Sequence, residues 1–109
     1  MEIVWTDLAI DSLSNIVHYV QSWFGKETAS DVSKRIIVFV DTLSASPYIG
    51  KQIKYLSAYG EIRCLIYKQN QIYYRIFDNH VEIILVWDGR QDPSRLRTLL
   101  LDYLIHKLD

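Results

Sequence analysis

The segment that decides the fold spans residues 60–93 and reads GEIRCLIYKQNQIYYRIFDNHVEIILVWDGRQDP. Apolar residues alternate with other residues in two runs, and this period of two predicts strands with one buried face. The alternating residues are Ile72, Tyr74 and Ile76, and then Val81, Ile83, Leu85 and Trp87. Asp78-Asn79-His80 predicts a tight reversal between the runs, because Asp and Asn tolerate left-handed backbone angles. We therefore expect three successive strands that end in a charged loop.

A mixed polar and aromatic row lies on the other face of the middle strand. Its members are Gln71, Tyr73, Arg75 and Phe77. Such a row is costly to maintain unless a ligand or a partner covers it. We interpret this face as a candidate binding surface.

The bulk composition indicates one folded domain, residues 1–109, because half of the residues are hydrophobic and 13% are aromatic. Twelve Lys and Arg against 13 Asp and Glu give a net charge of −1. The chain thus lacks the basic excess that attracts nucleic acids, although the net charge does not exclude a local cluster of arginines. The single cysteine, Cys64, is interpreted as a small buried hydrophobe.

Neither a membrane-spanning run nor a signal peptide is found in the sequence, so we expect a location in the cytoplasm. The sequence also lacks a glycine-rich phosphate loop and any His/Cys grouping with zinc spacing. We therefore predict neither a metal nor a cofactor.

The first half of the chain predicts a short strand followed by two helices. Residues 3–5 are apolar, and Thr6 is placed to cap a helix that Gly25 ends. A second helix is expected from about residue 27 until the segment before Pro47. The predicted inner stripes are Ala9, Leu13, Ile16, Val17, Val20, Trp23 and Phe24 on the first helix, and Ala29, Val32, Ile36, Phe39, Val40 and Leu43 on the second. So short a joint predicts an antiparallel hairpin.

Residues 47–60 are predicted to form a loop in which cations alternate with aromatic residues. Lys54 and Tyr55 are its candidate contact residues, since such side chains can stack on bases and touch phosphates. A solvated connector whose tyrosines lean on the core is an equally good interpretation.

Asp92-Pro93 predicts the start of a last helix, over residues 94–108, with Asp as the cap and Pro at the first position. The helix has more apolar surface than one stripe needs, with Leu101 and Ile105 outside the main stripe and Leu108 near its end. Two interpretations stay open: contact with another chain, including a homodimer, or burial within the monomer.

This order of elements, and the individual residues in it, resembles the RelE/ParE family of bacterial toxins from type II toxin-antitoxin systems. The matching motifs are Ile3-x-Trp5-Thr6-x-x-Ala9-x-x-x-Leu13-x-x-Ile16, Leu43-x-x-x-Pro47-x-x-Gly50, Arg63-x-Leu65, Ile72-x-Tyr74-Arg75-Ile76, Val81-Glu82-Ile83 and Gly89-Arg90-Gln91-Asp92-Pro93. They cover nearly the whole chain up to the last helix.

The resemblance implies an α+β domain. An N-terminal strand and a helical hairpin would pack on one face of a mostly antiparallel four-stranded sheet, with a C-terminal helix in addition and the other sheet face open and concave. Toxins of this family either cleave mRNA in the ribosome, as metal-independent endoribonucleases, or inhibit DNA gyrase. A cognate antitoxin neutralises them.

The resemblance also implies where a nuclease site would lie. The last arginine of the family's ribonuclease site falls on Arg90. The other candidates for catalysis are Arg75 and, if the register of its strand is shifted by one residue, Arg63. Gln71 stands where the ribonucleases have an arginine. Further contact residues for a target or an antitoxin are Tyr73, Asp88 and Gln91, and Asp88 is expected to orient Arg90.

The incomplete set of cations and the acidic balance favour a ParE-like inhibitor of a protein target such as gyrase. A ribosome-dependent ribonuclease is the alternative, and an inactive antitoxin-binding domain is a third. The hypotheses differ in one observation: whether Arg63, Arg75 and Arg90 converge or form separate ion pairs.

Overall fold

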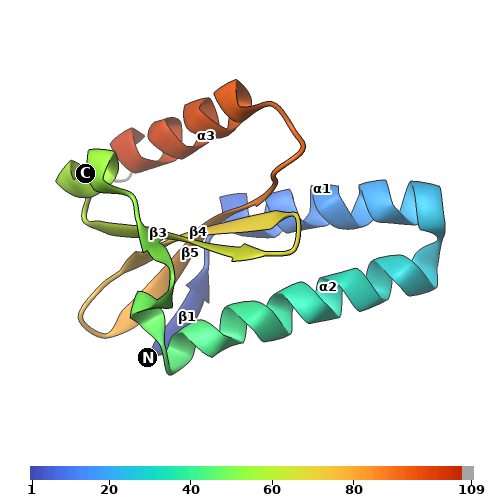
Figure 1. Cartoon of the computed structure of the whole chain (residues 1–109), viewed down its shortest axis with the longest axis horizontal. Coiled ribbons are helices and arrows are strands. Elements are labelled where there is room, and N and C mark those ends of the chain that lie inside the picture. The colour runs from blue at the N-terminus through green and yellow to red at the C-terminus, as the bar shows by residue number, and fades with distance from the viewer. Residues whose placement is uncertain (107–109) are drawn as a thin grey trace.

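A five-stranded sheet lies at the centre of the computed structural model, which describes residues 1–106 (Figure 1). The strands are β1 (Glu2–Trp5), β2 (Lys51–Gln52), β3 (Glu61–Tyr67), β4 (Asn70–Ile76) and β5 (His80–Asp88), and the helices are α1 (Asp7–Phe24), α2 (Lys26–Asp41) and α3 (Pro93–His106). The sheet order is β1-β5-β4-β3-β2. β1 runs parallel to β5, and the other neighbours are antiparallel. The predicted α+β class is confirmed.

The predicted loop over residues 47–60 contains the additional strand. β2 lies between short 3-10 helices in the sequence. The helices before it are η1 (Thr42–Ser44) and η2 (Pro47–Ile49), and the one after it is η3 (Lys54–Tyr59). β2 pairs Lys51 with Cys64 and Gln52 with Arg63. A strand of two residues is too short to show an alternation, so the sequence predicted four strands where the sheet has five.

The helical hairpin packs α1 and α2 against one face of the sheet (Figure 1). Thr6 caps α1, because its Oγ1 accepts a hydrogen bond from Ala9 N at 3.0 Å, and the same hydroxyl donates to Ile83 O at 2.9 Å. Gly25 alone joins the two helices, with a φ of 90°. The predicted hairpin is therefore present.

The last turn of α1 departs from the prediction. Trp23 and Phe24 were expected on the inner stripe, but 70% and 67% of their surfaces are exposed. The hairpin projects beyond the sheet, so these two residues have no strand below them (Figure 1). Helical spacing predicts which residues share a stripe, but it does not show where the covered surface ends.

A β-bulge in β5 changes which residues face the hairpin. Tyr73 pairs with Leu85 and Tyr74 pairs with Ile83, so Ile84 is an extra residue. Val81 and Ile83 pack with the hairpin as predicted, whereas Leu85 and Trp87 pack on the opposite face with α3. The prediction of one face for all four residues was wrong, because one inserted residue reverses the alternation after it.

The second face of the sheet is covered by α3 and η3, and is not the open surface that the resemblance implied (Figure 1). Leu96, Leu100 and Leu104 of α3 are buried there, together with Leu56 of η3. Asp92 caps the helix, since its Oδ1 accepts a hydrogen bond from Ser94 N at 2.9 Å. The predicted helix end at Leu108 lies outside the described residues.

Within residues 1–106, none of the helices has the length and apolar character needed to cross a membrane.

Candidate functional site

Four of the predicted contact residues and the catalytic candidate Arg90 group where β4 begins and β5 ends. We call Gln71, Tyr73, Asp88, Arg90 and Gln91 the Arg90 site. Asp88, at the end of β5, accepts from Arg90 Nη2 at 2.6 Å and from Arg90 Nε at 3.0 Å. At the adjoining start of β4, Tyr73 Oη donates to Gln71 Oε1 at 2.8 Å. Gly89 brings the Asp88–Arg90 pair next to the Gln71–Tyr73 pair. Its backbone packs so closely on Gln71 that a Cβ at this position would lie 3.1 Å from Gln71 Nε2.

Asp88 orients Arg90 as predicted, through the two side-chain hydrogen bonds and a third from Arg90 N at 2.9 Å. The side chain of Asp88 is buried, whereas 66% of that of Arg90 is exposed. The hydrogen bonds from the Arg90 guanidinium lower the pKa of the Asp88 carboxyl. The carboxylate therefore stays charged, and the guanidinium is held in one orientation towards solvent.

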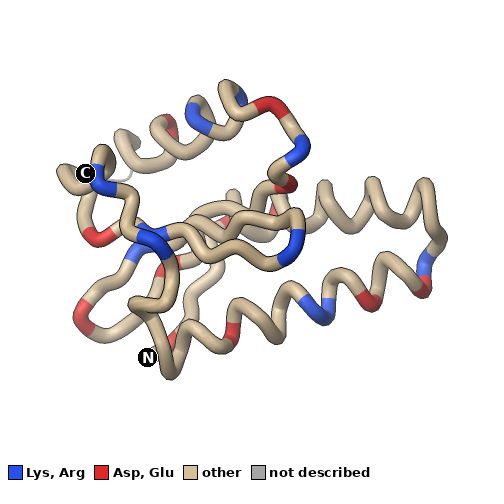
Figure 2. The backbone as a smooth tube through the Cα atoms, in the orientation of Figure 1, with Lys and Arg blue, Asp and Glu red and all other residues tan. Residues whose placement is uncertain are grey.

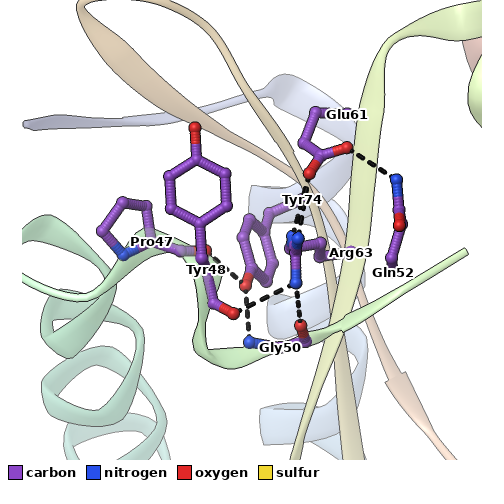
Figure 3. Close-up of polar contacts among 7 residues, drawn as sticks. All are labelled: Pro47, Tyr48, Gly50, Gln52, Glu61, Arg63 and Tyr74. Atoms are coloured by element: carbon purple, nitrogen blue, oxygen red, sulfur yellow. Dashed lines mark hydrogen bonds and ion pairs between the residues drawn. The ribbon is translucent and has the colours of Figure 1, made fainter.

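Arg63 lies elsewhere, where η2 and β2 meet the sheet (Figure 3). Its guanidinium pairs with Glu61 at 2.9 Å and donates to the carbonyl oxygens of Tyr48 and Gly50 at 3.0 and 2.7 Å. Tyr74 Oη donates to Pro47 O at 2.7 Å and accepts from Gly50 N at 2.9 Å. These contacts attach the segment before β3 to the sheet.

Arg75 is buried between the sheet and α3. Its Nη2 lies 2.9 Å from Glu82 Oε1, and its Nη1 donates to Tyr59 O at 3.1 Å. Tyr103 of α3 donates to the other oxygen of Glu82 at 3.0 Å. This network connects β4, β5, η3 and α3, and it leaves Arg75 with little exposed surface.

The three arginines thus form three separate ion pairs rather than one cluster. The remaining predicted contact residues lie in a second region, formed by η3 and the C-terminal half of α3. Lys54, Tyr55 and Ile105 are exposed there, while Leu101 is partly buried against the α3 side of the sheet.

The Arg90 site has no group tuned for proton transfer among the described residues. Burial raises the pKa of Tyr73 far above its ordinary value, and the pKa of Asp88 moves in the other direction, so both move away from neutrality. His80 lies at the opposite end of β5, stacked on Phe77. Burial also raises the pKa of the Cys64 thiol, which keeps it protonated.

The Arg90 site offers hydrogen-bonding groups to a ligand or a partner. A planar guanidinium and the side-chain amides of Gln71 and Gln91 present donors and acceptors at one edge of the molecule. Within residues 1–106, no three His, Cys, Asp or Glu side chains lie close enough together to hold a metal ion.

Sequence reasoning missed Tyr19, which lines a 220 Å³ pocket together with Asp88, Arg90 and Gln91. Tyr19 lies outside the apolar stripe of α1 and is half exposed. The signal for it was its spacing of four residues from Trp23, which places both rings on one side of the helix.

The model of one protein family, described as "ParE toxin of type II toxin-antitoxin system, parDE", matches residues 3–93. The chain belongs to the ParE toxin family. A solved structure, "Chromosomal ParDE TA system from P. aeruginosa", is similar to the chain with a TM-score of 0.67 and 20% sequence identity. The similarity covers 79% of this chain and 92% of that chain and, at this identity, concerns the fold. No curated protein matches the sequence.

In this ParE-family chain, several motif residues have structural contacts. Pro47, Gly50, Arg63 and Tyr74 come from three of the matching motifs and meet in one hydrogen-bonded network (Figure 3). A Cβ on Gly50 would lie 2.5 Å from Tyr74 Oη, so only glycine allows this close approach.

Proposed function

We propose that this ParE-family chain is a growth-inhibiting toxin that acts in the cytoplasm on a protein of DNA replication, with DNA gyrase as the target, and that a cognate antitoxin neutralises it. One observation carries the proposal. Arg63, Arg75 and Arg90 form separate ion pairs, whereas metal-independent RNA cleavage needs cations grouped with an acid and a base.

Two further observations support a protein target. The net charge of −1 provides little attraction to the phosphates that surround a ribosomal site. The exposed cation of the Arg90 site is held in place by Asp88, and the lowered pKa of that carboxyl keeps it charged, which suits recognition more than proton transfer.

The test uses the purified full chain in two assays. We expect inhibition of DNA supercoiling by gyrase, and no cleavage of mRNA in a translating extract. Cleavage of mRNA with supercoiling unaffected would overturn the proposal in favour of a ribosome-dependent ribonuclease, and loss of that cleavage in an Arg90→Ala variant would then assign Arg90 to it. Expression without growth arrest would instead indicate an inactive antitoxin-binding domain.

The antitoxin has a separate test. We expect a short reading frame beside the gene for this chain to encode a protein that co-purifies with it and restores growth when both are expressed. The structure "Chromosomal ParDE TA system from P. aeruginosa" motivates this expectation by its similar fold. Growth arrest that persists although the two proteins co-purify would contradict neutralisation.

A further inference from the structure

The tip of the helical hairpin exposes three aromatic side chains. The exposed fractions are 50% for Tyr19, 70% for Trp23 and 67% for Phe24. Tyr19 and Trp23 lie together, with ring centroids 6.4 Å apart. The tip projects beyond the sheet (Figure 1), and at least half of the surface of each of these three residues is exposed. Three large aromatic residues in one exposed place mark a contact surface rather than ordinary scattered exposure.

The aromatic tip continues into the Arg90 site. Tyr19 lines the 220 Å³ pocket that Arg90, Asp88 and Gln91 complete. Asp88 occupies the Nε and Nη2 side of the guanidinium. Among residues 1–106, the Nη1 side has no hydrogen-bond partner, so that edge of the fork can receive a second carboxylate in a bidentate pair. An apolar contact surface and a hydrogen-bond donor for a carboxylate therefore lie side by side.

The charge around this surface indicates the class of partner. No Asp, Glu, Lys or Arg occurs between Asp11 and Lys26, and the outer half of α1 is correspondingly uncharged in Figure 2. Nucleic-acid binding needs several cations along a phosphate backbone. Here the guanidinium of Arg90 is already paired with Asp88. Two further cations flank the surface, Lys26 after α1 and Arg95, which lines a pocket with Asp88 and Gln91, but the stretch between Asp11 and Lys26 that carries the aromatic residues has none. Trp, Tyr and Arg are the residues that most often dominate the binding energy at protein interfaces.

We propose that Tyr19, Trp23, Phe24 and Arg90 form the surface with which this chain grips its protein target, by inserting the aromatic tip into an apolar pocket that has a carboxylate at its rim. The inference rests on the proposed function and names the part of the molecule that performs it. The rings fill the pocket, and the Nη1 edge of Arg90 binds the carboxylate of the partner. The hairpin thus has two roles, since its inner face supports the sheet and its tip makes the contact.

The test compares Trp23→Ala and Tyr19→Ala with the parent chain in two readouts: growth arrest over a range of expression levels, and supercoiling by purified gyrase. Ile49→Ala is the matched control, because Ile49 is 61% exposed and lies in η2, which follows the C-terminal end of α2 and not the hairpin tip. We expect each tip variant to need about tenfold more protein for the same inhibition, and Ile49→Ala to match the parent. Trp23→Phe should retain part of the potency, since it keeps an aromatic ring. Circular dichroism checks that every variant is folded.

The outcomes separate this inference from the proposed function. Folded tip variants as inhibitory as the parent would overturn the inference, whatever the target. Growth arrest by the parent without gyrase inhibition would overturn the choice of gyrase alone, and the tip would then be judged on growth arrest.

Sedimentation showing a parent dimer that Trp23→Ala makes monomeric would assign the tip to a second copy of the chain, and loss of RNA binding in the tip variants would assign it to nucleic acid. A parent chain without any inhibitory effect would overturn both proposals.

Discussion

Each arginine takes its role from the acceptors around it. Arg75 has two acceptors, the carboxylate of Glu82 and a backbone carbonyl, and is buried with them, so it stabilises the packing of α3 on the sheet. Arg90 has one carboxylate partner and keeps most of its surface exposed, so it is available for contact with another molecule. The same side chain therefore serves structure in one place and recognition in the other.

We expect Arg75→Met to lower the free energy of unfolding by about 3–5 kcal/mol, because it leaves a carboxylate in the interior without its cation. Urea denaturation followed by circular dichroism measures the change. Arg97→Met is the matched control, because Arg97 is exposed and forms no ion pair among residues 1–106, and its urea midpoint should stay close to that of the parent. Equal destabilisation by the two variants would contradict the stabilising role of the buried Arg75 pair.

The pair of Asp88 and Arg90 predicts a pH dependence. The pKa of Asp88 is lowered in the folded state, so the pair stabilises the protein above the ordinary aspartate pKa and loses its effect as the pH falls through the lower folded value. Asp88→Asn should therefore have a lower urea midpoint than the parent at pH 7, and the difference should shrink at pH 3. A difference that stays constant with pH would contradict this role for the carboxylate.

At the scale of elements, short connections and single contacts decide where each helix lies. Gly25 alone turns the chain from α1 into α2, and Tyr103 alone connects α3 to the Glu82 carboxylate by a side-chain hydrogen bond among the described residues. The bulge at Ile84 places Leu85 and Trp87 under α3. The helix layers depend on these few residues more than on helix propensity.

Gly25→Ala should destabilise the chain by roughly 1–3 kcal/mol, because the backbone at this position has a φ of +90° that side-chain-bearing residues rarely adopt. The cost is conformational, since a Cβ there would meet no atom within 4 Å. Thermal unfolding of the variant measures it. An unchanged melting temperature would show that the joint relaxes into another conformation.

The contact between Tyr103 and Glu82 predicts a loss of stability in alkali. Burial, followed by the nearby Glu82 charge, raises the pKa of Tyr103 to about 12 from an ordinary value of 10.0. The contribution of the phenol is fully present below pH 10 and disappears as the pH rises towards 12. Tyr103→Phe should thus be less stable than the parent at pH 8, and the two denaturation curves should converge by pH 12. Tyr55→Phe, at an exposed tyrosine, should follow the parent throughout.

At the scale of the whole molecule, one sheet supports two helical layers. The hairpin packs with Ile72, Tyr74 and Val81 on one face, and α3 packs with Ile62, Leu85 and Trp87 on the other. Adjacent residues of the same strands, such as Tyr73 and Tyr74, thus belong to different hydrophobic clusters. The two layers cannot separate without exposing the strands that they share.

We therefore expect a single cooperative unfolding transition. Far-UV circular dichroism reports all helices. The change in tryptophan fluorescence reports mainly Trp87 under α3 and Trp5 beside the hairpin, because Trp23 is already 70% exposed in the folded chain. The two signals should have the same urea midpoint. An earlier fluorescence transition with retained helical signal would show that α3 detaches before the rest of the molecule unfolds.

Much of the fold was predictable from the sequence because it depends on local spacing. Alternation predicted β4 and the first part of β5, the Thr6 and Asp92 caps predicted where α1 and α3 begin, and the ordered motifs predicted the family. These features are encoded by residues close together in the chain.

Only the tertiary structure decided which elements cover the two faces of the sheet and which of the three arginines remains exposed. The bulge at Ile84, the strand of two residues and the end of the sheet below Trp23 leave no periodic signal in the sequence. Whether Arg63, Arg75 and Arg90 meet depends on strand register and on the carboxylates opposite them, which are contacts between distant residues. Local patterns determine the elements, and long-range packing determines which side chains remain available for a partner.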